Sequence, residues 1–157
     1  MIKYNCEKTA QVDVNKLRKG ENYMQNNERK EPKILEGCYK SAEHANIVWV
    51  CDGAANVGQV GQAVGVLLTN MDKARMCCTT AVGASSKPHL DIAERAKKNI
   101  VIDGCENRCA SKVLEKAGKK IHYEITISKY LQKVPTLDIY MGNVKKIAQT
   151  IMEEAQL

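Results

Sequence analysis

The sequence lacks phenylalanine and has a single tryptophan, so aromatic residues make up only 4% of its 157 positions. The core of a domain of this size must therefore be built from Val, Ile, Leu, Ala and Met. The longest apolar runs, such as Ile47–Val50, are far too short to cross a bilayer. The chain also starts without the apolar stretch of a signal peptide. We therefore expect a cytoplasmic globular protein without membrane contact.

A dense basic run is missing as well, although the formal net charge is +6. Lysine and arginine are interleaved with glutamate, as in residues 94–98, and no aromatic residues alternate with them. This pattern predicts a mildly basic, solvated surface and no nucleic-acid partner.

Cysteine, in contrast, is abundant, with seven residues in a chain that shows no export signal. In a reducing compartment, this favours metal binding or thiol chemistry over a disulfide framework. One or two cysteines are easily explained as small buried apolar residues. Four cysteines at the ends of predicted strands need another explanation.

The first 45 residues differ in composition from the rest. They are rich in Asn, Lys, Glu and Gln, contain Pro32, and show only a weak helical pattern. This composition predicts a partly ordered polar extension over residues 1–45, followed by the domain over residues 46–157. Cys6 and Cys38 fall in this extension.

From residue 46 onward, short apolar runs alternate with helical patterns. The predicted strands are residues 47–50, 74–78, 100–102 and 121–127. The predicted helices are residues 58–70, 90–97, 107–117 and 142–155. The alternation predicts an α/β fold of three layers, in which a mostly parallel four-stranded sheet carries helices on both faces, as in half of a Rossmann fold. Right-handed crossovers then bring all the carboxyl ends of the strands to one edge, where ligands bind.

Four cysteines lie at that predicted edge. Cys51 follows the first strand, Cys78 closes the second, and Cys105 comes shortly after the third. Cys109 lies four residues beyond Cys105, in the first turn of the next helix, where free backbone N–H groups favour thiolates. Four sulfurs around one point suit tetrahedral zinc, whose Zn–S bonds are about 2.3 Å long.

Three neighbouring residues have weaker claims to this site. His89 follows the second strand and is a reserve ligand, although a lone histidine at a helix start is more often solvated or capping. Cys77 points to the opposite face from Cys78 in a strand, so we assign it to the core. Asp103 is either a partner of the site or a cap of the turn and helix that follow.

The residues around these cysteines also resemble the DGC domain family of bacterial and archaeal proteins, named for an Asp-Gly-Cys motif. The resemblance covers about residues 46–118, and residues 103–110, Asp-Gly-Cys-Glu-Asn-Arg-Cys-Ala, are its most specific part. The family has four characteristic cysteines that suggest zinc, and no settled biochemical role. Carried onto this chain, these cysteines are Cys51, Cys78, Cys105 and Cys109. The chain departs from many members in having Ala54 where a second cysteine follows the first, and in having the extra Cys77.

Several functions remain open from the sequence. The first is a protein that holds zinc through these four cysteines, either for structure or for delivery. The second is an enzyme of thiol or persulfide chemistry that uses the same cysteine cluster, and the third is an iron–sulfur protein. A plain interaction module, with the cysteines as apolar filler, explains the pattern least well. No catalytic residue, substrate or protein partner can be assigned.

Overall fold

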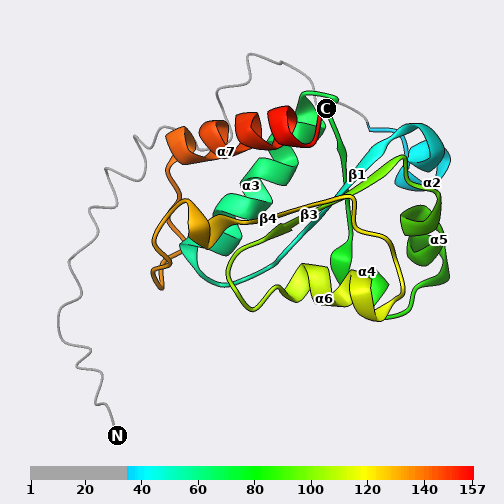
Figure 1. The fold of residues 1–157 in the computed structure, drawn as a ribbon, viewed down its shortest axis with the longest axis horizontal. Coiled ribbons are helices and arrows are strands. Elements are labelled where there is room, and N and C mark those ends of the chain that lie inside the picture. Colours follow the sequence, from blue (N-terminus) through cyan, green and yellow to red (C-terminus); the bar gives the residue numbers. More distant parts are fainter. Residues whose placement is uncertain (1–34) are drawn as a thin grey trace, which may run out of the picture. The chain divides into compact units, whose positions relative to one another are not determined.

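The central feature of the computed structural model, which describes residues 35–157, is a four-stranded parallel sheet (Figure 1). The strands are β1 (Asn46–Val50), β2 (Arg75–Cys77), β3 (Lys98–Asp103) and β4 (Tyr123–Thr126). They lie in the order β2-β1-β3-β4, and every neighbouring pair is parallel. The predicted α/β class and parallel sheet are confirmed.

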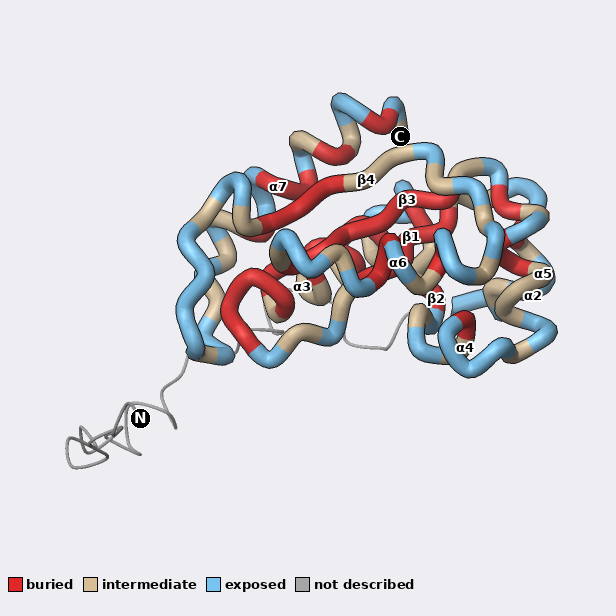
Figure 2. Tube along the Cα trace, turned by 60° about the horizontal axis from the view of Figure 1, so that its bottom comes forward, coloured by how far each residue is buried: buried red, intermediate tan, exposed pale blue. Residues whose placement is uncertain are grey.

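The two central strands, β1 and β3, are buried on both faces, as their β-branched runs predict. Along β1, Ile47 and Trp49 face one side of the sheet, whereas Val48 and Val50 face the other. The two sides belong to separate hydrophobic clusters. Figure 2 shows the strands as the most deeply buried segments, with helices outside them.

Each face of the sheet carries its own set of helices (Figure 1). The first face is covered by α3 (Asn56–Asn70) and α7 (Met141–Glu154). The opposite face is covered by α4 (Thr79–Gly83), α5 (Lys87–Arg95) and α6 (Cys109–Lys116), together with α2 (Cys38–Ser41) and the 3-10 turn η1 (Ala42–His44). A second 3-10 turn, η2 (Ile127–Lys129), follows β4. The helices therefore lie on both faces, as predicted.

The order of the strands creates a switch point between β1 and β3. The connection from β1 passes through α3 on one face, whereas the connection from β3 passes through α6 on the other. The chain therefore leaves these adjacent parallel strands toward opposite faces of the sheet, and the carboxyl edge at such a point is the usual ligand site of sheets of this kind.

Part of the predicted N-terminal extension packs against the domain. Ala42 of η1 is fully buried among residues of the second face. The Arg95 guanidinium on α5 donates hydrogen bonds to the Tyr39 carbonyl and to the Glu43 carboxylate, each at 3.0 Å. The remainder of that extension, including Cys6, lies outside the described residues. Among the helices of residues 35–157, none is long and apolar enough to span a membrane.

Candidate functional site

Cys51 lies at the switch point, directly after β1. Its backbone N–H donates to the Ile102 carbonyl at 3.0 Å, which carries the β1–β3 ladder one residue further. Its half-buried thiol accepts hydrogen bonds from the backbone N–H groups of Gly53 and Gly104. Cys109 lies close enough to interact electrostatically with this thiol. Two loops that are distant in sequence, the one after β1 and the one after β3, therefore meet around one sulfur.

Close packing of glycines makes this meeting possible. A Cβ added to Gly58, in the first turn of α3, would lie only 2.2 Å from the Gly53 carbonyl oxygen. A Cβ added to Gly104 would lie 3.0 Å from the Gly58 Cα. The loops after β1 and β3 thus touch the start of α3 backbone to backbone, and a larger residue at position 58 would force them apart.

Asp103 fixes the start of α6, and with it the position of Cys109. Its fully buried carboxylate accepts hydrogen bonds from the Ala110 N–H at 2.8 Å and the Ser111 N–H at 3.2 Å. The Ser111 hydroxyl donates a third hydrogen bond at 2.5 Å. Of the two roles considered for Asp103, the structure shows the cap, because the carboxylate satisfies free N–H groups of the first helical turn.

Arg108, immediately before α6, adopts a left-handed backbone conformation with φ 49°. Its guanidinium is held from two sides, by Glu124 on β4 and by Glu115 on α6. The hydrogen bond from Arg108 lowers the pKa of the Glu124 carboxyl. These ion pairs hold the turn that leads from Cys105 to Cys109.

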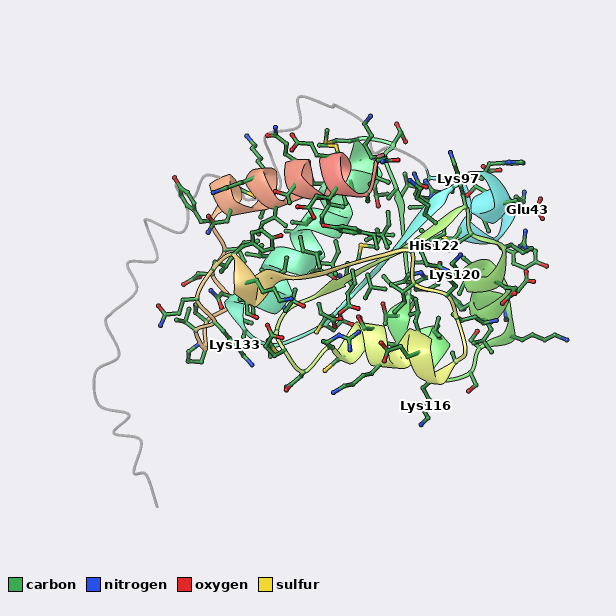
Figure 3. All side chains as sticks on the ribbon, viewed as in Figure 1. Glu43, Lys97, Lys116, Lys120, His122 and Lys133 are labelled. Carbon is green, nitrogen blue, oxygen red and sulfur yellow. The ribbon has the colours of Figure 1, made fainter. Side chains whose placement is uncertain are left out.

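Lys133 reaches Cys105, a contact that sequence reasoning missed. Its ammonium Nζ lies 3.4 Å from the Cys105 Sγ. Figure 3 shows Lys133 on the connection between η2 and α7, beside the loop that joins β3 to α6. Lys133 therefore supplies a hydrogen-bond donor to the cysteine at the start of the turn into α6.

Asn56 holds the connection that carries Lys133. Its side-chain amide donates to the Gln132 carbonyl at 2.9 Å and accepts from the Val134 N–H at 2.8 Å. Its own backbone N–H donates to the Val134 carbonyl at 3.3 Å. The residues on either side of Lys133 are therefore fixed to the first turn of α3, which directs the lysine toward the cysteines.

Cys78 and Cys77 lie on the other side of β1, at the end of β2. Cys78 is exposed and lies just beyond β2, before α4, whereas the Cys77 side chain is buried in the cluster on the second face. Cys77 nevertheless lines a pocket of about 630 Å³ together with Cys78 and His89. His89, the reserve ligand, also lines this pocket, and its Nδ1 pairs with the Ser86 hydroxyl at 2.9 Å.

Three cysteines have shifted thiol pKa values, which are raised at Cys51 and Cys77 and lowered at Cys38. Burial raises the pKa of Cys51, and the N–H groups of Gly104 and Gly53 offset part of this effect. A hydrogen bond from Cys77 and the nearby Arg75 charge lower the pKa of Cys38 to about 6, although burial acts in the opposite direction. The same hydrogen bond raises the pKa of Cys77.

The positions of the four candidate ligands in the structure can be compared with the geometry that one zinc ion requires. In residues 35–157, no three His, Cys, Asp or Glu side chains are close enough together to hold a metal ion. The sheet keeps Cys78 away from the other three, because β1 lies between β2 and β3 and strands two places apart are about 10 Å apart. Cys51, Cys105 and Cys109 belong to adjoining loops, but they are not gathered closely enough to form a three-ligand group either. The donors are chemically suited to zinc, whose ligand sulfurs are at most about 4.6 Å apart, so these loops must close around the ion and Cys78 must approach them.

Comparison with known proteins gives one match. The family model of the DGC domain matches residues 47–151, which include β1 to β4 and all four candidate ligands. No curated protein and no solved structure matches the chain.

Proposed function

Because this chain belongs to the DGC domain family, we propose that it binds a thiophilic metal ion, zinc, through cysteine thiolates at the carboxyl edge of its sheet. The proposed ligands are Cys51, Cys78, Cys105 and Cys109. The carrying observation is the meeting of the loops after β1 and β3 around the Cys51 thiol, which lies beside the N–H groups of Gly53 and Gly104 and near Cys109.

The local environment supports thiolate ligands at this edge. Zinc binds the deprotonated sulfur, and the coordinated metal itself drives off the proton even where burial opposes ionisation. Backbone N–H groups at Cys51 and the Lys133 ammonium at Cys105 offset part of the negative charge of several thiolates. Such contacts to metal-bound sulfur tune both affinity and orientation.

Assembly of the site requires the loops that carry the cysteines to close around the ion, with Cys78 moving from across β1. Cys51, Cys105 and Cys109 belong to the two adjoining loops at the switch point, whereas Cys78 approaches from across β1. We propose that Cys78, exposed before the short helix α4, completes the site when metal binds. Four sulfur ligands leave no open position for water, which favours a structural or delivery role for the metal.

Metal analysis of anaerobically purified protein tests this proposal. About one zinc ion per chain is expected, and cobalt substitution should give the absorption of thiolate-to-cobalt charge transfer. The variants Cys105→Ser and Cys109→Ser should each bind the metal at least about tenfold more weakly. Cys6→Ser is the matched control, with unchanged metal content. Reduced protein that binds no metal, or ligand variants that retain full affinity, would refute the proposal.

Thiol or persulfide chemistry at the same cysteines is the alternative, and the contact between Lys133 and Cys105 favours it. In metal-free protein it predicts that Cys105 alkylates faster than the exposed Cys78, and that Lys133→Gln removes the difference. Equal rates for both thiols would exclude this role for Lys133. A colourless protein prepared without oxygen would exclude an iron–sulfur cluster.

A further inference from the structure

Two further thiols, which are not among the proposed zinc ligands, lie at the end of β2 that carries Cys78. Cys38 on α2 and Cys77 on β2 interact through their side chains, although 39 positions separate them in the sequence. The Cys38 thiol also contacts the backbone of β2, because its Sγ donates to the Met76 carbonyl at 3.5 Å. Two sulfurs in such contact, on neighbouring elements, need only small rotations of their side chains to form a disulfide.

Both thiols line the pocket of about 630 Å³ described above. This volume falls within the range that holds a small organic molecule. Cys38 is the partly exposed member of the pair, and Cys77 is the buried one. Cys38 is therefore the more accessible of the two thiols in the pocket.

The surroundings of the pair suit a nucleophilic thiolate at Cys38. The Cys77 thiol donates to the Cys38 sulfur, and the Arg75 guanidinium from the same strand interacts with it. Both contacts favour the charged form of Cys38, the reactive form in thiol–disulfide exchange.

We propose that Cys38 and Cys77 form a dithiol site that reduces a low-molecular-weight disulfide bound in this pocket. The Cys38 thiolate attacks one sulfur of the substrate, which forms a mixed disulfide and expels the first half as a thiolate that takes a proton from solvent. Cys77 then attacks the Cys38 sulfur, and the second half leaves with the proton that Cys77 loses. The protein dithiol is oxidised by two electrons, and the substrate disulfide is reduced to two thiols.

The experiment uses the reduced full-length chain and oxidised glutathione as the small disulfide. After acid quenching and alkylation, peptide mass mapping should show a link between Cys38 and Cys77 and the release of two glutathione thiols per link. Cys77→Ser should stop at one glutathione on Cys38. Cys38→Ser should prevent the reaction at Cys77, with folding checked by circular dichroism.

Cys78 lines the same pocket and is the competing partner for Cys38. In Cys78→Ser, the link between Cys38 and Cys77 should still form, and its loss would overturn the assignment of Cys77. Absence of the link in the natural chain, or no glutathione adduct on Cys38 in Cys77→Ser, would overturn the proposal. Its failure is separable from that of the metal site, because the zinc content of Cys38→Ser reports on the metal site alone.

Discussion

The two ends of the carboxyl edge hold their cysteines in different ways. Between β1 and β3, Cys51 receives hydrogen bonds from the backbone, and the surrounding loops are closely packed at glycines. At the end of β2, the side chains of Cys38 and Cys77 interact with each other and line a pocket. A thiol that lies beside backbone N–H groups can still bind an added metal ion. A thiol that lies beside a second thiol can instead be oxidised to a disulfide with that partner. The same residue type therefore suits metal binding at one end and redox chemistry at the other.

The largest effect on stability should come from a substitution that disrupts the glycine packing of the loops between β1 and β3. Gly58→Ala places a methyl group against the Gly53 carbonyl, where no flexible side chain can yield. We expect a loss of about 3 kcal/mol in the free energy of unfolding, measured by chemical denaturation. Gly37→Ala is the control, because no atom lies within 4 Å of its added Cβ. Equal stability of the two variants would contradict the close packing described here.

Gly58→Ala also tests whether the cysteines between β1 and β3 function independently of those at the end of β2. It should weaken metal binding at Cys51 while the link between Cys38 and Cys77 still forms. Loss of both properties in a variant that remains folded would show that the two ends act as one unit.

An intermediate effect is expected from the cap of α6. Asp103→Asn replaces an acceptor of three hydrogen bonds with a group that presents N–H donors to the amides of Ala110 and Ser111. A loss of about 2 kcal/mol in the free energy of unfolding is expected. Asp52→Asn, at an exposed position, should change stability little. If Asp103→Asn matches this control, the carboxylate does not hold the helix.

The smallest effect should come from the ion pair beside Cys109. The pKa of Glu124 is lowered in the folded protein by Arg108, so its stabilisation is present above its ordinary pKa and is lost as the pH falls through the lowered value. Glu124→Gln should therefore be slightly less stable than the natural chain at pH 7, and equally stable at a pH below the lowered pKa. Thermal unfolding measured across this pH range checks the sign, and a difference that grows toward low pH would contradict it.

Much of the fold was predictable, because hydrophobic periodicity is a local signal. The predicted strand 47–50 corresponds to β1, and the predicted helix 142–155 corresponds to α7, each within one residue at its ends. Gly118, the predicted helix cap, adopts φ 68° directly after the last turn of α6. The short helix α4 was missed because five residues are too few to establish a helical period.

The candidate site was predictable only in part. The predicted strands place Cys51 and Cys105 at one edge of the sheet, because parallel strands all have their carboxyl ends at the same edge. Two contacts could not be predicted, that of Lys133 with Cys105 and that of Cys38 with Cys77. Each joins segments that are far apart in the sequence and share no pattern, so no local sequence signal indicates the contact. Cys38 was assigned to the polar extension, and only the packing of α2 against β2 reveals its partner.

Trp49 gives the protein a built-in optical probe. It is the chain's sole tryptophan, it is fully buried at the centre of β1, and its indole N–H donates to the Asn99 side chain at 2.9 Å. In the sheet register it stands directly opposite Cys77. Its intrinsic fluorescence therefore monitors the interior of the sheet next to the dithiol, without a label and in the natural sequence.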